Sequence, residues 1–201
     1  SLSFSGSNSP RAFRAGKIYE QELYIYKGNT GKEKGFRNNG VYLVLGGAGG
    51  IGTAWSDYMI KQYNARIIWI GRRDLDRNIQ DKIERLGQQG TPPWYIQGDA
   101  ADEQDMTRAL ELIKKKYNNI DGLVHSVMVL DDKSFLNMDR ECFENMLNSK
   151  IKTSVTIAKL LRDYDLGFIL FFSSMTSFVP NPGQGHYAAG CLFTDAFARW
   201  L

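Results

Sequence analysis

The chain has 201 residues, of which 43% are hydrophobic and 23% are charged, a composition typical of one ordinary globular domain. Its formal net charge is only +3, and because Lys and Arg are spread among Asp and Glu, we expect no nucleic-acid partner. No apolar run approaches the roughly 20 residues of a membrane span, and two distant cysteines with two histidines indicate neither a disulfide framework nor a metal site, so a reducing, cytoplasmic setting is expected.

The N-terminal part predicts a small appendage to the main domain. Residues 1 to about 16 are rich in Ser, Gly and Asn and indicate a loop or linker, whereas residues 17–27, KIYEQELYIYK, predict a strand. Turn-forming residues fill the stretch up to Gly40. We therefore expect residues 1–40 to form a linker and a strand, and residues 41–201 to form the main domain.

From Val41 onward, strand patterns alternate with longer helical patterns. This alternation predicts an α/β fold: a doubly wound parallel sheet, Rossmann-like, with helices on both faces. Because the chain stops inside an apparent helix without a stop signal, we expect the domain to be C-terminally incomplete. The predicted strands are 41–45, 66–70, 94–97, 122–125 and 167–172, and the predicted helices are 51–63, 76–86, 102–117, 140–163 and a last one from residue 187.

A glycine-rich loop directly follows the first strand of this domain and precedes a helical pattern. Glycines permit a tight turn and let backbone N–H groups approach a pyrophosphate at the positive end of a helix. The strand–loop–helix context therefore predicts a dinucleotide-binding site rather than a plain connection. The loop consists of Gly46, Gly47, Ala48, Gly49, Gly50, Ile51 and Gly52.

Charged residues follow the next two strands. Arg72 and Arg73 stand where an acidic side chain favours the ribose hydroxyls of NAD and an arginine favours the 2′-phosphate of NADP. We therefore predict NADP, with a solvated surface charge as the alternative for either arginine. Asp99 ends the third strand and is placed to accept from the adenine amino group, with a cap of the following helix as its alternative.

A serine and a tyrosine follow the last predicted strand. Ser174 ends an apolar run, and after a loop rich in Pro, Gly and Asn, Tyr187 opens an Ala-rich helical pattern. A hydroxyl at the carboxyl end of a strand and a phenol in the first turn of the next helix can converge on one carbonyl group in the ligand crevice of an open α/β sheet. The alternative is that Ser174 only ends the strand and Tyr187 only packs in the core.

With these motifs the chain resembles the short-chain dehydrogenase/reductase superfamily, and within it the catalytic subdomain of ketoreductases from modular polyketide synthases, over about residues 12–201. Its most specific feature is a set of spacings, because Lys150 lies 24 residues before Ser174, which lies 13 before Tyr187. Most of the superfamily carries the catalytic lysine four residues after the tyrosine, where this chain has Cys191. Polyketide ketoreductases carry the lysine on the preceding long helix and usually have asparagine at the position of Cys191. The residues 188–191, AAGC, are similar to those of ketoreductases from synthases whose acyltransferases act in trans.

The resemblance also interprets two further segments. Residues 13–23 are similar to the junction between the structural and catalytic subdomains of such ketoreductases. Leu130, Asp131 and Asp132 match the motif of ketoreductases that give a D-configured hydroxyl, with an acidic surface turn as the alternative.

The resemblance implies NADPH-dependent reduction of a β-ketoacyl thioester on an acyl carrier protein, within a cytoplasmic bacterial multidomain synthase. Tyr187 would protonate the ketone oxygen, Lys150 would lower the tyrosine pKa and hold the nicotinamide ribose, and Ser174 would hold the carbonyl oxygen. The implied partners are the carrier protein and neighbouring synthase domains, including the structural half of the ketoreductase. Further implied contacts are with the cofactor at Ala100, His125 and Ser126, and with the substrate at Met175 and Gln184.

Other interpretations stay open. A free-standing reductase of small alcohols or ketones is disfavoured by the displaced lysine and by the N-terminal junction. A ketoreductase-like scaffold that has lost reduction, or a domain that alters a stereocentre, is favoured by Cys191 but not by the other retained residues. His125 is either a contact of the nicotinamide ribose through its backbone or a packed core residue, and His186 is expected to face the substrate mouth or solvent.

Overall fold

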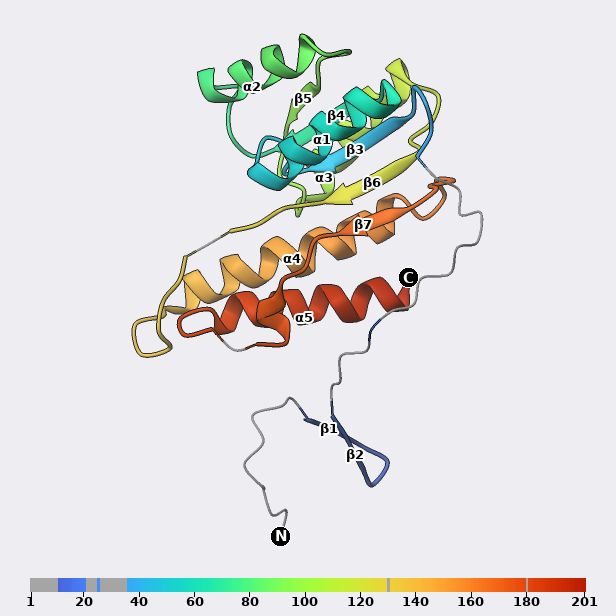
Figure 1. Cartoon of the computed structure of the whole chain (residues 1–201). Helices are drawn as coiled ribbons and strands as arrows, with labels where there is room; N and C mark the ends of the chain where they lie inside the picture. Colours follow the sequence, from blue (N-terminus) through green and yellow to red (C-terminus); the bar gives the residue numbers. More distant parts are fainter. Residues whose placement is uncertain (1–10, 21–24, 26–35, 130, 180) are drawn as a thin grey trace. The chain divides into compact units, whose positions relative to one another are not determined.

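The computed structural model describes residues 11–20, 25, 36–129, 131–179 and 181–201 (Figure 1). The chain divides into two compact units, residues 1–33 and residues 34–201, which are described separately. Residues 36–40 belong to the larger unit, in which the backbone N–H of Asn39 donates to the carbonyl oxygen of Tyr63 at 2.8 Å.

The smaller unit contains an antiparallel hairpin of β1 (Arg11–Arg14) and β2 (Lys17–Glu20). Its two-residue turn places both Ala15 (φ 48°) and Gly16 (φ 76°) in the left-handed region, which matches the twist of paired strands. The expectation of a loop is therefore wrong for the residues of β1. The turn is not predicted because alanine rarely adopts the left-handed conformation that this turn requires. The predicted strand 17–27 is confirmed up to the end of β2, and its remainder, residue 25 excepted, lies outside the described residues.

The larger unit is built on a five-stranded parallel sheet in the order β5-β4-β3-β6-β7. The chain winds outward from β3 through β4 to β5, then returns to pair β6 with the other edge of β3 (Figure 1). This reversal confirms the predicted doubly wound, Rossmann-like fold. The strands are β3 (Val41–Leu45), β4 (Arg66–Gly71), β5 (Trp94–Gln97), β6 (Gly122–His125) and β7 (Ile169–Phe171).

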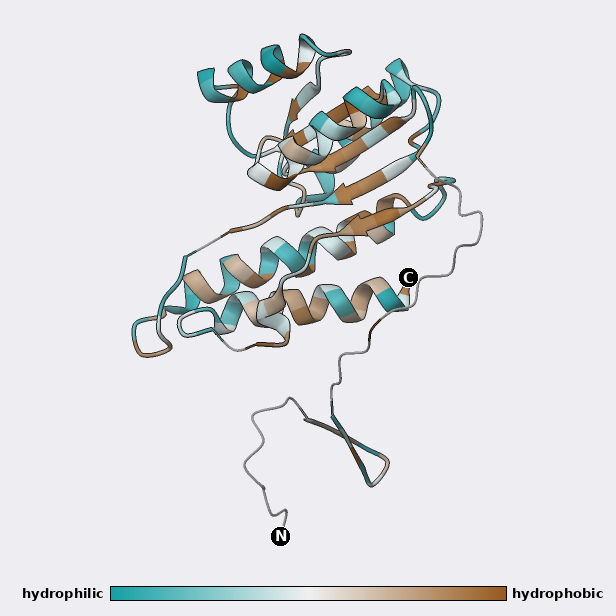
Figure 2. Ribbon diagram, in the orientation of Figure 1, coloured by the Kyte–Doolittle hydropathy of each residue, from teal (hydrophilic) through white to brown (hydrophobic). Residues whose placement is uncertain are grey.

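Helices cover both faces of this sheet, and Figure 2 shows apolar residues concentrated on its strands. Tyr42 and Val44 of β3 belong to a core cluster with α1 and α2, whereas Leu43 and Leu45 belong to a second cluster with α3 and α4. Such two-sided burial is expected of a central parallel strand. The helices are α1 (Gly50–Tyr63), α2 (Arg77–Gly87), α3 (Glu103–Lys116), α4 (Arg140–Leu160) and α5 (Gly185–Trp200), and the short 3-10 helix η1 (Met175–Ser177) precedes α5.

The observed ends of the last elements differ slightly from the expected ones. Helix α4 ends at Leu160 instead of residue 163, because residues 161–163 form a turn. Helix α5 begins at Gly185, ahead of Tyr187. Strand β7 is shorter than the predicted 167–172, because it pairs only with the short strand β6.

Asp121 secures the start of the central strand. Its Oδ2 accepts from the backbone N–H of Val41 at 2.8 Å, and its Oδ1 accepts from the guanidinium of Arg37 at 2.6 Å and from the amide of Asn119 at 3.1 Å. The carboxylate is only 9% exposed. A buried backbone donor at the first residue of β3 therefore depends on this side chain.

Replacing Asp121 with Ala is expected to lower the free energy of unfolding by about 1–3 kcal/mol, because the N–H of Val41 loses its acceptor. A matched control is Asp81→Ala, since Asp81 pairs with Arg77 on the exposed surface of α2 and its loss should cost at most about 0.5 kcal/mol. Urea unfolding followed by circular dichroism measures both values. Equal losses in the two variants would contradict the anchoring role of Asp121.

Candidate functional site

A cavity of about 360 Å³ lies at the carboxyl ends of the sheet strands. It spans the point between β3 and β6 where the strand order reverses, which is where open α/β sheets bind ligands. Its wall consists of residues 46, 48–51, 70–73, 95, 98–100 and 126–128, drawn from β4, β5 and the segments that follow β3, β4, β5 and β6. Four separate segments therefore build one crevice.

The glycine-rich loop has two faces. Gly46 has φ +74° and turns the chain out of β3, and five of the seven loop residues line the cavity. Gly47 and Gly52 do not: a Cβ at Gly47 would lie 2.0 Å from the ring of Trp69, and one at Gly52 would lie 2.6 Å from the Cα of Gly47. These two glycines let the loop pack closely against the sheet and against α1, while the others leave backbone exposed to a ligand.

The first turn of α1 faces the cavity with its backbone donors. The N-cap is Gly49, which has no side chain to accept from the N–H groups of that turn. A Cβ at Gly50 would meet only open space, so an anion can approach the backbone there. The ammonium of Lys82 on α2 donates to the carbonyl oxygen of Ala48 at 2.7 Å and braces the loop. Unpaired N–H groups at a positive helix end fit the pyrophosphate of a nicotinamide dinucleotide.

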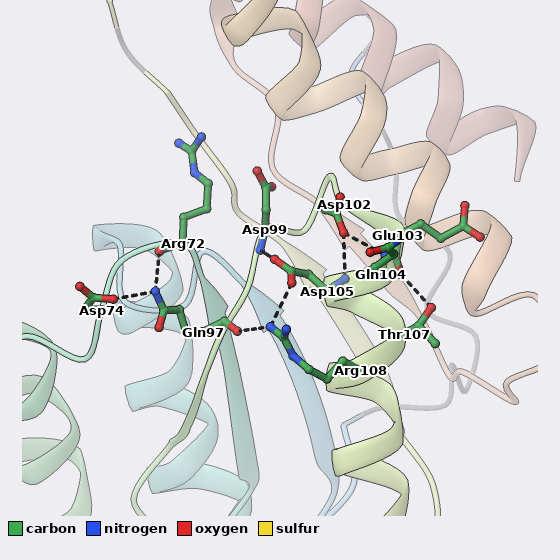
Figure 3. A network of polar contacts seen from close by, with 10 residues as sticks. All are labelled: Arg72, Asp74, Gln97, Asp99, Asp102, Glu103, Gln104, Asp105, Thr107 and Arg108. Atoms are coloured by element: carbon green, nitrogen blue, oxygen red, sulfur yellow. Dashed lines mark hydrogen bonds and ion pairs between the residues drawn. The ribbon is translucent and has the colours of Figure 1, made fainter.

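Both predicted arginines lie at the rim of this cavity, on the loop after β4. The hydroxyl of Tyr95 on β5 donates to the carbonyl oxygen of Arg73 at 2.6 Å and holds that loop. Figure 3 shows the side chains of Arg72 and Asp99 extending in the same direction, with no hydrogen bond from the guanidinium of Arg72 to the other residues drawn. Because Arg73 forms an exposed ion pair with Asp76 at 3.3 Å, Arg72 is the better placed of the two for an anionic ligand.

The loop after β5 holds Asp99 at the cavity, with Ala100 buried beside it. The Oδ1 of Asp99 accepts from the backbone N–H of Ala101 at 2.9 Å, and its own N–H donates to Asp105 at 2.8 Å (Figure 3). Helix α3 is capped by Asp102, which accepts from the backbone N–H groups of residues 104 and 105. The helix-cap alternative for Asp99 is therefore wrong.

Lys150 is buried between α4 and α5. Its Nζ donates to the carbonyl oxygen of Phe172 at 2.9 Å. The two helices approach closely here, since a Cβ at Gly190 would lie 3.2 Å from the Cγ of Lys150. Burial lowers the pKa of Lys150, while the Cys191 thiol and the Asp195 carboxyl act in the opposite direction.

Tyr187 stands in the first turn of α5, and its hydroxyl lies 3.7 Å from the sulfur of Met128 at the cavity wall. Burial raises the pKa of Tyr187, and Cys191 raises it further, whereas the neighbouring Ser174 lowers it. The net direction is upward, opposite to the expected effect of Lys150. The physical reason is that desolvation dominates and the ammonium of Lys150 is engaged by a backbone carbonyl.

Ser174 follows β7 and is the N-cap of η1. Its Oγ accepts from the backbone N–H of Thr176 at 3.2 Å and lies 2.9 Å from the hydroxyl oxygen of Thr176. Ser174 and Tyr187, the two groups predicted to converge, are near enough that Ser174 lowers the pKa of the phenol. The neighbouring Met175 is 63% exposed.

The acidic segment after β6 is tied to the start of α5. The side chain of Gln184 donates to Asp132 at 2.8 Å. Asp131 pairs with Lys133 at 3.0 Å, and this contact lowers the pKa of the Asp131 carboxyl. Leu130, the first residue of the predicted motif, lies outside the described residues.

Both histidine rings are fully buried. His125 is fully buried, its ring packs 5.7 Å from that of Phe171, and burial together with Lys150 lowers its pKa to about 3. His125 is therefore a packed, neutral core residue, and its neighbour Ser126 lines the cavity instead. The expectation that His186 faces the mouth or solvent is wrong: its ring is fully buried because it contacts the carbonyl oxygen of Asp131 at 3.0 Å.

Sequence reasoning missed several residues that shape the site. Tyr95 holds the loop after β4, here called the arginine loop, and Lys82 holds the glycine-rich loop. Met128 contacts the phenol of Tyr187, and Thr176 contacts Ser174. Each acts through a contact that no local pattern signals, and three of the four join segments far apart in the chain.

Within the part of the chain that the structure describes, no group of three or more His, Cys, Asp or Glu side chains could hold a metal ion. Among the same residues, no helix is both long enough and apolar enough to cross a membrane.

Comparisons with known proteins identify the family. The family model described as KR domain matches residues 40–201. Over 166 residues the chain is 51% identical to polyketide synthase PksN of Bacillus subtilis (strain 168), and over 190 residues it is 45% identical to polyketide synthase PksM of the same organism. These matches cover 83% and 94% of this chain but only 3% and 4% of the two relatives, so the chain corresponds to a small part of each.

Solved structures agree with the family model. The chain superposes with a TM-score of 0.80 on a ketoreductase domain from the bacillaene assembly line, at 27% identity, covering 94% of this chain and 45% of that one. An N-terminal ketoreductase from the macrolactin assembly line gives a TM-score of 0.79 at 26% identity, covering 91% of this chain and 36% of that one. The chain therefore belongs to the KR domain family, the ketoreductases of modular polyketide synthases within the short-chain dehydrogenase/reductase superfamily.

Proposed function

We propose that this domain reduces a β-ketoacyl thioester, carried on an acyl carrier protein, to a D-configured β-hydroxyacyl thioester with NADPH as the reductant. The observation that carries the proposal is the position of the Tyr187 hydroxyl, 3.7 Å from the sulfur of Met128 in the wall of the glycine-lined cavity, with Ser174 close enough to lower the pKa of the phenol. Met128 lines that cavity and contacts the phenol, so the phenol stands at the cavity wall formed after β6.

The side chains divide the reduction between them. A bound nicotinamide supplies the hydride that forms the new C–H bond. Tyr187 gives its phenolic proton to the carbonyl oxygen, and solvent later returns a proton to the phenolate. Ser174 donates a hydrogen bond to the same oxygen as negative charge develops on it. Because the pKa of Tyr187 is raised, the phenol is protonated at neutral pH, as a proton donor must be.

The choice of NADPH over NADH is supported by the loop after β4. Arg72 lines the cavity and extends from its rim beside Asp99 (Figure 3). A guanidinium forms paired, charge-assisted hydrogen bonds with a phosphate, which NADPH has on its adenosine ribose and NADH lacks. Arg72 is therefore the residue proposed to select the cofactor.

The carrier-bound substrate is supported by the relatives, and the proposed D configuration rests on the Leu130-Asp131-Asp132 motif of the sequence. PksN and PksM are polyketide synthases of which this chain matches a small part. Asp132 accepts from Gln184 just before the helix that carries Tyr187, so the acidic segment contacts the start of α5. We propose the carrier protein and the adjoining synthase domains as the partners of this domain.

Replacing Tyr187 with Phe should lower kcat for reduction of a β-ketoacyl-pantetheine mimic by roughly 10²- to 10⁴-fold, because the proton donor is lost. The dissociation constant of NADPH should stay within about twofold, since the phenol is not proposed to hold the cofactor phosphates. Tyr117→Phe, at the far end of α3, is the control and should retain wild-type kcat. Retained turnover in Tyr187→Phe would refute the role of Tyr187 as the proton donor. A wild-type domain that never consumes NADPH would favour the alternative that the domain is a scaffold without reductase activity.

The pH profile follows from the raised pKa of Tyr187. Its protonated form is the donor and its pKa lies above the ordinary 10.0, so kcat for reduction should stay level between about pH 7 and pH 9 and fall only as the pH rises past that pKa. Steady-state assays with saturating NADPH and substrate measure the profile. A fall of kcat already below about pH 9 would show that a cation outweighs burial at the phenol.

Replacing Arg72 with Ala should weaken NADPH binding roughly 10- to 150-fold, because hydrogen bonds to a charged group contribute about 1.5–3 kcal/mol. NADH binding should not change. Arg77→Ala removes an arginine that pairs with Asp81 on the exposed side of α2, and it serves as the control for net charge. Fluorescence titration with both nucleotides measures the ratio, and an equal loss for NADPH and NADH would contradict the selective role.

A further inference from the structure

The hydroxyl of Thr176 lies 2.9 Å from the Oγ of Ser174, within the first turn after β7. The backbone N–H of Thr176 donates to the same serine oxygen at 3.2 Å. One residue therefore contacts the Ser174 hydroxyl twice, once through its backbone and once through its side chain.

The positions of the protons follow from the number of donors and acceptors. A hydroxyl group has one proton to donate and two lone pairs that accept. If Thr176 donates its hydroxyl proton to Ser174, its two contacts occupy both acceptor positions of Ser174. The serine proton is then directed to a third group. A serine that must polarise a carbonyl oxygen needs its proton free for that oxygen.

A competing acceptor for the threonine proton is weaker. The side-chain oxygen of Gln184 lies 3.5 Å from the Thr176 hydroxyl, at the outer limit of a hydrogen bond, and already accepts from Asn181 at 2.8 Å. The amide of Gln184 is held in this orientation because its nitrogen donates to Asp132 at 2.8 Å. Either hydroxyl can donate across the 2.9 Å contact, and because the Gln184 oxygen is a poor acceptor for Thr176, we assign the threonine proton to Ser174.

We propose that Thr176 is a positioning residue that keeps Ser174 a hydrogen-bond donor toward the substrate oxygen. The inference rests on the proposed reduction. Without the Thr176 hydroxyl, one acceptor position of Ser174 is vacant, and the neighbouring phenol of Tyr187 can donate into it. The proton of Tyr187 is then directed to Ser174 instead of the substrate, and reduction slows.

The test compares two substitutions in the complete synthase module. Thr176→Val keeps the shape of the side chain and removes its hydroxyl, and we expect kcat to fall about 5- to 10-fold, the loss typical of one neutral hydrogen bond. The KM for the β-ketoacyl-pantetheine mimic, the dissociation constant of NADPH and the Tm should not change. Thr176→Ser restores the hydroxyl and should return kcat to within about twofold of the wild type.

A matched control is Thr107→Val, because the hydroxyl of Thr107 donates to the backbone carbonyl of Glu103 at 2.7 Å on the exposed side of α3, and this variant should keep wild-type kcat. Wild-type kcat in Thr176→Val overturns the proposal. An equal loss in Thr176→Ser overturns it as well, and so does a loss accompanied by weaker NADPH binding or a lower Tm, which indicates a structural role.

A second measurement does not depend on turnover. Ultraviolet difference titration, with Tyr187→Phe subtracted to isolate one phenol, reports the pKa of Tyr187. We expect Thr176→Val to raise that pKa and Thr176→Ser to leave it unchanged, because only the valine variant lets Tyr187 donate to Ser174. An unchanged pKa in Thr176→Val overturns the proposal. A wild-type module without reductase activity refutes the proposed function, and this titration still decides the role of Thr176.

Discussion

Parallel pairing of β3 with β4 on one edge and with β6 on the other creates the site. The chain leaves β3 in one direction along the sheet and later returns to its opposite edge, so the loops on the two sides diverge and leave a crevice between them. Burial of β3 on both faces holds this arrangement, and Asp121 fixes its first residue. The glycine-rich loop and the arginine loop occupy that crevice because they follow β3 and β4 directly.

The segments that carry Lys150, Ser174 and Tyr187, the proposed catalytic residues, lie together because α5 packs against α4 and against the turn after β7. Gly190 permits the close approach of α5 to Lys150, and the turn after β7 brings Ser174 to Tyr187. Burial dominates the electrostatics at this place, since it lowers the pKa of Lys150 and raises the pKa of Tyr187. Burial thus keeps the phenol protonated, and the Nζ of Lys150 donates to the backbone carbonyl of Phe172.

At position 191 this chain has cysteine where polyketide ketoreductases usually have asparagine. Burial raises the pKa of its thiol, which lies beside Lys150 and Tyr187. A protonated thiol offers only weak hydrogen bonds, whereas the asparagine usual at this position carries a strong donor and a strong acceptor. The hydroxyl of Thr176 and the carbonyl of Phe172 supply the stronger polar contacts of Ser174 and Lys150.

The sequence by itself determined the order of strands and helices, the doubly wound sheet and the place of the glycine-rich loop, because strand and helix periodicity and glycine spacing are local properties of the chain. It misjudged the loop expected at residues 11–14 and the environment of His186, where a backbone angle or a contact between distant segments decides. Only the tertiary structure decided the direction of the Tyr187 pKa and the support of the loops by Tyr95 and Lys82. These properties depend on which groups from separate segments share one buried space, and desolvation and hydrogen bonding act only after the chain has brought them together.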